Sequence, residues 1–193
     1  MKFLTTFLSL AVAFSVLLGS ITADAQDDKP RPSAKASVSQ RIGVDTDITI
    51  DYSRPGVKGR AIWGDLVPYG LTPGNKYSDE KPFPWRLGAN ENTTFETSKD
   101  ILVEGQKLPA GKYSLHAIPS ASSWVIAFSK VNDLWGSYKY DQKNDAIRIT
   151  VASEKAAHKE WLEFGFDEYT GTSAEVYLQW EKVKVPFKVE AAK

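Results

Sequence analysis

Alternation of apolar and polar residues is the dominant pattern along this chain. In residues 44–52, Ile48, Ile50 and Tyr52 fall on one side of an extended strand and polar residues fall on the other. The same period of two recurs in residues 124–130, 146–152, 162–166, 174–181 and 183–189. Such alternation is typical of strands that have one face on a core and one face in water. About ten strands, spaced in this way, predict an all-β fold.

Residues typical of turns separate the predicted strands, and two places depart from the strand pattern. Residues 104–107, 108–111 and 169–173 separate strand-like segments, and the last of these predicts a hairpin. Residues 153–161 are the only candidate helix, although a loop is an equal alternative. Pro186 lies within the last alternating segment and predicts an edge strand there, because proline cannot donate to a ladder. The sequence predicts a single-domain antiparallel β-sandwich.

Two irregular segments interrupt the strands. Residues 53–92 hold five of the ten prolines and several aromatic residues, which predicts one long, packed, aromatic-rich insertion rather than a disordered linker. Residues 131–145 form a second polar and aromatic loop. Functional residues are often carried by such loops.

The N-terminus has the features of a secretory signal peptide. Lys2 precedes an uncharged apolar run at 3–18, and residues 23–25 fit the small-residue rule for cleavage after Ala25. A membrane anchor is the alternative, but the apolar run is short for a span, and we expect no transmembrane segment after signal removal. We expect an exported protein, periplasmic or secreted, with a signal peptide at 1–25, a flexible leader at 26–36 and one domain at 37–190.

Charge and cysteine content narrow the possible partners. The chain carries 24 Lys and Arg against 24 Asp and Glu, and cleavage would remove one of each, Lys2 and Asp24. A net charge of zero argues against nucleic acid as a partner. The chain has no cysteine and only two histidines, so we expect no metal and no cofactor. The acidic residues of 131–145 lack the spacing of a calcium-binding loop.

Five ordered motifs resemble a family of exported bacterial proteins known as domain of unknown function 2911. They are DYSRPGVKGR (51–60), LVPYG (66–70), WRLGANENTTF (85–95), LPAGKYSLHAIP (108–119) and WGSYKYD (135–141). The resemblance covers about residues 37–189. It implies export and a single β-rich domain, and it implies no catalytic residues.

The densest candidate site is the stretch that contains Trp85, Arg86, Asn90 and Glu91. One interpretation is a ligand platform, in which the tryptophan offers a flat apolar face and the polar side chains fix the edges of a ligand. The other is a structural knot, in which Trp85 plugs the end of the sandwich and Arg86 pairs with Glu91. The residue types alone favour the structural interpretation.

Two further candidates lie nearby in sequence. Tyr52, Arg54 and Arg60 form a basic and aromatic cluster that could bind a carboxylate or phosphate, or could belong to a solvated turn. His116 shares a strand face with Ser114, and a partly buried structural histidine is favoured over a general base.

Three functional hypotheses remain open from the sequence. The leading one is a non-catalytic periplasmic or secreted module that binds a small polar or glycan-like ligand near Trp85, Arg86, Asn90 and Glu91, with help from Arg54 and Arg60. The second is an accessory protein of a larger envelope assembly, which would use its loops or an edge strand as a contact surface. The third is a hydrolase that uses Glu91, Asp65 or His116, which would require carboxylates from distant segments to meet.

Overall fold

The computed structural model describes residues 29–192. The predicted signal peptide, residues 1–25, and the start of the predicted leader lie outside the described residues. Within the described part of the chain, no helix has the length and apolar character needed to cross a membrane.

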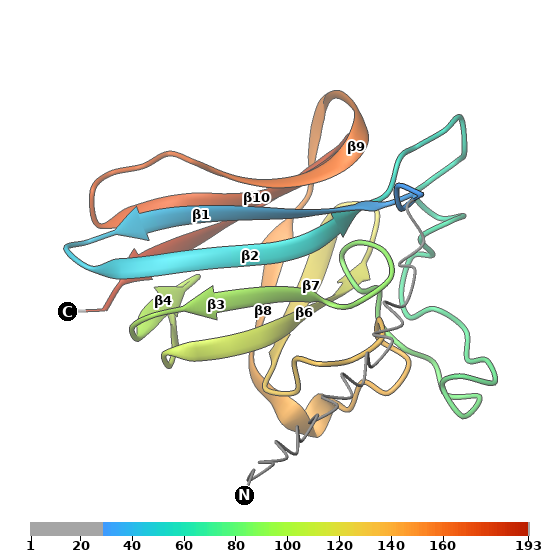
Figure 1. Ribbon diagram of the computed structural model, residues 1–193, viewed down its shortest axis with the longest axis horizontal. Coiled ribbons are helices and arrows are strands. Elements are labelled where there is room, and N and C mark those ends of the chain that lie inside the picture. Colours follow the sequence, from blue (N-terminus) through green and yellow to red (C-terminus); the bar gives the residue numbers. More distant parts are fainter. Residues whose placement is uncertain (1–28, 193) are drawn as a thin grey trace, which may run out of the picture. The chain divides into compact units, whose positions relative to one another are not determined.

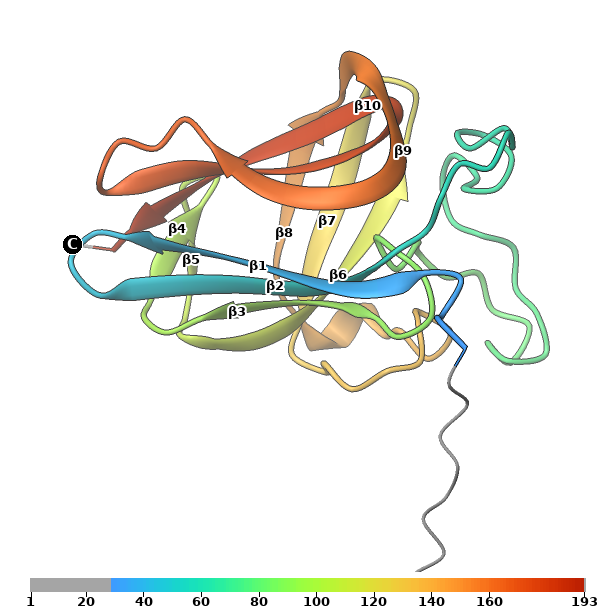
Figure 2. The same cartoon turned by 45° about the horizontal axis from the view of Figure 1, so that its top comes forward.

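Two antiparallel sheets pack face to face, as the alternation predicts (Figures 1 and 2). The first sheet has the order β1-β2-β3-β6-β7-β8. Its strands are β1 (Ala34–Ile42), β2 (Thr46–Arg54), β3 (Thr93–Thr97), β6 (Gly111–Pro119), β7 (Ser123–Ser129) and β8 (Asp145–Ala152). The second sheet has the order β5-β4-β10-β9, with β5 (Gln106–Leu108), β4 (Ile101–Val103), β10 (Ser173–Ala191) and β9 (Glu154–Asp167). A 3₁₀ helix, η1 (Gln142–Asn144), precedes β8. The predicted all-β sandwich is confirmed.

The core lies between the sheets and is built from the residues that the alternation places inward. Ile48, Ile50 and Tyr52 of β2 are buried, and the Tyr52 ring packs edge-on against Phe164 of β9 at 5.1 Å. Phe128 of β7 meets Phe187 of β10 in the same way at 6.0 Å. These contacts cross from one sheet to the other, so burial of aromatic surface holds the two layers together.

The strand boundaries correct three sequence-based predictions. β1 begins at Ala34, so residues 34–36 of the predicted leader belong to the sheet; Ala36 pairs with Tyr52 and packs on the core. The candidate helix at 153–161 is part of β9, because its backbone pairs with β10 across two register shifts and this pairing overrides local helix propensity. β10 is an internal strand, and Pro186 is accommodated because it lies between the ladder to β9, which ends at Lys184, and the ladder to β4, which begins at Val189.

A cluster of four tryptophans closes one end of the sandwich. Trp124 comes from β7, Trp180 from β10, and Trp63 and Trp85 from the long insertion. Trp63 meets the other three rings edge-on at 5.1–5.8 Å, and Trp85 stacks on Trp180 at 6.1 Å. This tryptophan cluster joins both sheets to the insertion, which Figure 1 shows beyond the ends of β1 and β2 in teal and green.

The loop at 131–145 is fastened to the outer face of the first sheet by His116. The Ser114 hydroxyl donates to the carbonyl of Val131 (2.7 Å), so it accepts from His116 Nε2 (2.7 Å), and the Ser137 hydroxyl then donates to His116 Nδ1 (2.7 Å). The imidazole and both serines are fully buried. Burial, together with the nearby charge of Arg86, lowers the pKa of His116 to about 3, and the neutral ring is the form that these bonds require.

We expect this buried histidine to make the protein less stable in mild acid. The unfolded chain takes up a proton on His116 below pH 6.5, whereas the folded chain does not until the pH approaches 3. The free energy of unfolding contributed by this group is therefore complete above pH 6.5 and falls by about 2 kcal/mol between pH 7 and pH 5. Denaturant unfolding of the mature chain at both pH values measures this loss.

The variant His116→Gln is the control, because it should lose this part of the pH dependence. Proton NMR of the folded wild type gives an independent check, since the His116 ring signals should not titrate between pH 7 and pH 5. A ring that titrates near its ordinary pKa would contradict the assignment.

Candidate functional site

The segment 84–91 is held by its backbone and by the tryptophan cluster. Trp85 forms a two-residue bridge with Ala117 of β6, in which each amide donates to the other's carbonyl at 2.8 Å. Leu87 and Asn90 both adopt positive φ angles, +52° and +60°, and the Thr93 hydroxyl donates to the Leu87 carbonyl at 3.0 Å. A buried leucine in the left-handed region costs about 1–3 kcal/mol. The surrounding contacts therefore impose the shape of this segment.

Trp85 is half-buried in the tryptophan cluster and is not a free platform. Its ring packs against Trp63, Trp124 and Trp180. The part of Trp85 that remains exposed lines a hollow that Arg86 also lines. The indole thus closes the sandwich end and also forms part of a pocket wall.

Arg86 is held by the Asn90 carbonyl and contacts two residues of the 131–145 loop, Tyr138 and Gly136. Its Nη1 donates to the Asn90 carbonyl at 2.6 Å, and its guanidinium lies 4.9 Å from the centre of the Tyr138 ring. Gly136, with a φ of +70°, leaves the space that the guanidinium occupies, since a Cβ there would lie 2.2 Å from Arg86 Cζ. Stacking on a tyrosine suits the planar, weakly hydrated guanidinium.

Arg86 and Glu91 do not pair with each other. Glu91 Oε2 accepts from Arg31 at 2.8 Å, and Lys35 lies 3.5 Å from its other oxygen. The hydrogen bond from Arg31 is the main reason that the pKa of Glu91 falls to about 2. Glu91 is therefore a carboxylate at physiological pH, and the positive charges of Arg31 and Lys35 compensate its negative charge.

Four of the six arginines in the described chain have a carboxylate partner, namely Arg31, Arg41, Arg54 and Arg148. Arg60 and Arg86 make no salt bridge within residues 29–192. Arg60 donates from Nε and Nη2 to the carbonyls of Val57 and Gly56, at 3.1 and 2.6 Å, and has no further hydrogen bond among the described residues. Both arginines retain N–H groups that could bind an anion.

These two arginines line the same hollow, which we name the arginine pocket. It has a volume of about 440 Å³ and lies between the long insertion and Tyr138. Trp85, Phe83 and Tyr138 supply aromatic wall, and Asn75 and Asn90 supply polar lining. Such a mixture of aromatic surface and a few polar groups is usual for small-molecule sites. Of the predicted site residues, Trp85, Arg86, Asn90 and Arg60 meet here.

The other four predicted site residues lie elsewhere. Tyr52 and Glu91 border a separate, open hollow of about 790 Å³ near β1, β2 and β3. Arg54 ties β2 to β9, because its Nε donates to the Leu162 carbonyl at 2.8 Å and it pairs with Glu163 at 3.5 Å. His116 anchors the 131–145 loop as described above.

The residues of the hydrolase hypothesis are not brought together. Asp65 is exposed, Glu91 pairs with Arg31, and His116 is fully buried. The Ser137 hydroxyl donates to His116, as a nucleophile would donate to a base, but both side chains are buried and border none of the hollows described.

The acidic residues of the 131–145 loop also have separate tasks. Asp141 caps η1, while the buried Asp145 carboxylate accepts from the Tyr140 hydroxyl at 2.6 Å and lies 2.9 Å from Arg148. Burial raises the pKa values of both Tyr140 and Asp145. Within residues 29–192, no group of three or more potential metal ligands converges.

Sequence reasoning missed Tyr138 and Asn75 as pocket residues. Tyr138 lies 52 residues after Arg86 in the chain, and only the fold stacks the two. The aromatic content of the 131–145 loop indicated that this loop was of interest. It did not indicate that Tyr138 would contact Arg86. Asn75 organises its own turn, since its carbonyl accepts from the Ser78 and Glu80 amides.

Gly136→Ala should destabilise the protein and displace Arg86. The new methyl group would push the guanidinium off Tyr138 and away from the Asn90 carbonyl, and the positive φ adds strain, so we expect a loss of about 1–3 kcal/mol in the free energy of unfolding, larger than at a positive-φ glycine with open space. Gly105→Ala is a matched control, because Gly105 has a φ of +76° and open space around it. Denaturant unfolding compares the two variants, and equal losses would show that Arg86 does not fill the space at Gly136.

Comparison with known proteins gives a family but no characterised relative. A family model described as "Protein of unknown function (DUF2911)" matches residues 33–189. Neither the curated proteins nor the solved structures include a match. Because the matched region spans both sheets, the insertion and the 131–145 loop, the chain belongs to the DUF2911 family.

Proposed function

We propose that this protein is an exported, non-catalytic module that binds a small polar ligand carrying a negative charge in the arginine pocket. The observation that carries this proposal is the placement of Arg60 and Arg86, the two arginines without a carboxylate partner within residues 29–192, on one hollow. A carboxylate, sulfate or phosphate group on the ligand would match their free N–H groups.

The walls of the pocket support a polar ligand with one flat face. Trp85 and Tyr138 offer apolar surface, and Asn75 and Asn90 offer polar contacts. Glycan-like acids, which combine a ring with hydroxyl groups and a carboxylate, fit this arrangement. Because the surrounding loops are held by the tryptophan cluster and by His116, little ordering would be needed on binding.

The proposal of export rests on the N-terminal sequence. Lys2, the apolar run at 3–18 and the small residues before Gln26 have the form of a cleaved signal. Expression of the full chain in a bacterial host should give a mature protein whose first residue is Gln26, found outside the cytoplasm. N-terminal sequencing and cell fractionation check this, and an uncleaved cytoplasmic chain would contradict it.

Ligand binding is tested with simple acids on the mature chain. Isothermal titration with galacturonate, sulfate and inorganic phosphate should show saturable binding of at least one of them. Arg60→Gln should weaken that binding by about tenfold or more, as expected for loss of a charge-assisted hydrogen bond. The fold should remain, because Arg60 is exposed.

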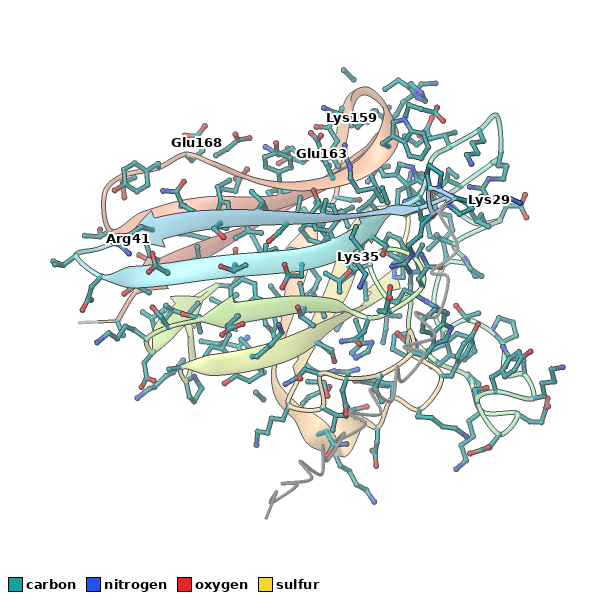
Figure 3. All side chains as sticks on the ribbon, in the orientation of Figure 1. Lys29, Lys35, Arg41, Lys159, Glu163 and Glu168 are labelled. Carbon is teal, nitrogen blue, oxygen red and sulfur yellow. The ribbon has the colours of Figure 1, made fainter. Side chains whose placement is uncertain are left out.

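Arg41→Gln is the matched control, since it removes the same charge from an exposed arginine. Arg41 lies near the end of β1 that is remote from the long insertion (Figure 3), and its partner is Asp47 at 2.7 Å. We expect this variant to bind as the wild type does. An equal loss in both variants would mean general attraction by positive charge, and no binding of any of the three acids would reject the proposal.

A further inference from the structure

A second hollow beside the arginine pocket presents exposed aromatic rings to solvent. Tyr77 of the long insertion is 57% exposed and Trp135 of the 131–145 loop is 60% exposed. Together with Leu134, Tyr138 and Lys139 they border a hollow of about 530 Å³. We name this surface the aromatic shelf. Large aromatic side chains that gather on one exposed hollow mark a binding surface more often than isolated ones do.

The shelf is held in place by contacts between its two loops. The Tyr77 ring lies 5.5 Å from the Tyr138 ring, which packs edge-on against the buried Phe83 at 5.1 Å. Lys139 bonds to Asp79 across the two loops at 2.6 Å. This exposed ion pair adds little energy by itself, but it fixes the relative position of the loops that carry the rings.

Tyr138 connects the shelf to the arginine pocket, because it lines both hollows. Arg86 stacks on Tyr138, and Gly136, which receives the Arg86 guanidinium, directly follows Trp135. A ligand that places a charged group on Arg86 could therefore continue over Tyr138 toward Tyr77 and Trp135. The two hollows therefore share Tyr138 as a common wall.

The chemistry of the shelf indicates sugar rings. Flat aromatic faces pack well against the C–H faces of pyranose rings, while the hydroxyl groups of a sugar need polar neighbours such as those on Lys139 and Asp79. Lys76, whose Nζ lies 5.0 Å from the Tyr77 ring centre, has no carboxylate partner within 4 Å in the described chain, so it can pair with a carboxylate on a sugar that covers Tyr77.

We infer that the arginine pocket and the aromatic shelf together bind an acidic oligosaccharide, with a carboxylate in the pocket and further sugar rings on Tyr77 and Trp135. This inference rests on the proposed function for the charged subsite. It adds the chemical class of the ligand and a second subsite. A nucleic acid would offer flat bases and phosphates, but the expected export of the chain favours a saccharide.

Isothermal titration of the mature chain with galacturonate and with its linear hexamer tests the inference. The hexamer should bind at least tenfold more tightly than the monomer, because it also covers the shelf. Trp135→Ala and Tyr77→Ala should each remove most of this gain and leave monomer binding unchanged. An uncharged hexasaccharide of glucose should bind weakly.

Tyr169→Ala is the control for loss of an exposed aromatic ring. Tyr169 is 58% exposed and lies in the turn between β9 and β10, away from the residues of both hollows. It should not change binding of the monomer or the hexamer. Circular dichroism of each variant confirms that the fold is retained.

The possible failures are distinguishable. Equal affinities for monomer and hexamer, or a gain that survives both shelf substitutions, would overturn the shelf and leave the proposed function standing. Binding of the uncharged hexasaccharide through Trp135, with no binding of galacturonate, would overturn the charged subsite. If an oligonucleotide binds more tightly than any saccharide does, or if an envelope protein binds at Trp135, the inferred class of ligand is wrong.

Discussion

Packing of four tryptophans is the interaction on which the rest of this structure depends. Trp124 and Trp180 belong to opposite sheets, and Trp63 and Trp85 belong to the long insertion. The packing of these four rings therefore closes the sandwich and also holds its largest loop. Each indole buries a large area, and each favourable pair adds about 0.5–1.5 kcal/mol beyond that burial. The chain has no cysteine and therefore no disulfide, so noncovalent contacts such as this cluster hold the insertion on the sandwich.

The position of Arg86 follows from this cluster. Trp85 is held on both sides, by its ring in the cluster and by its backbone on Ala117, so the next residue must leave the cluster in a fixed direction. The positive φ angles of Leu87 and Asn90 return the chain to β3, and the Asn90 carbonyl then accepts from Arg86. The strained backbone at Leu87 and Asn90 thus places the Arg86 guanidinium against the Tyr138 ring.

The sequence predicted the sheets well because strand alternation is a local property. Every alternating segment from Ile48 to Val189 became a strand with the expected face inward. It predicted the site less well because the site depends on contacts between distant segments. Neither the stacking of Arg86 on Tyr138 nor the pairing of Glu91 with Arg31 has a local signal. The strand at 154–161 was missed for a related reason, since pairing with β10 decides the conformation of a segment whose composition suits a helix.

Electrostatics links the pocket to the fold beneath it. The chain is neutral overall, but Arg60 and Arg86, which have no salt-bridge partner among the described residues, place two positive charges on one hollow. The charge of Arg86 also contributes to the low pKa of His116, and the neutral imidazole is what allows Ser137 to donate to Nδ1 and hold the 131–145 loop. That loop in turn carries Tyr138 and Gly136, which position Arg86. The arginine, the histidine and the loop therefore stabilise one another, and an uncharged residue in place of Arg86 would remove the cation and also weaken the support of the pocket.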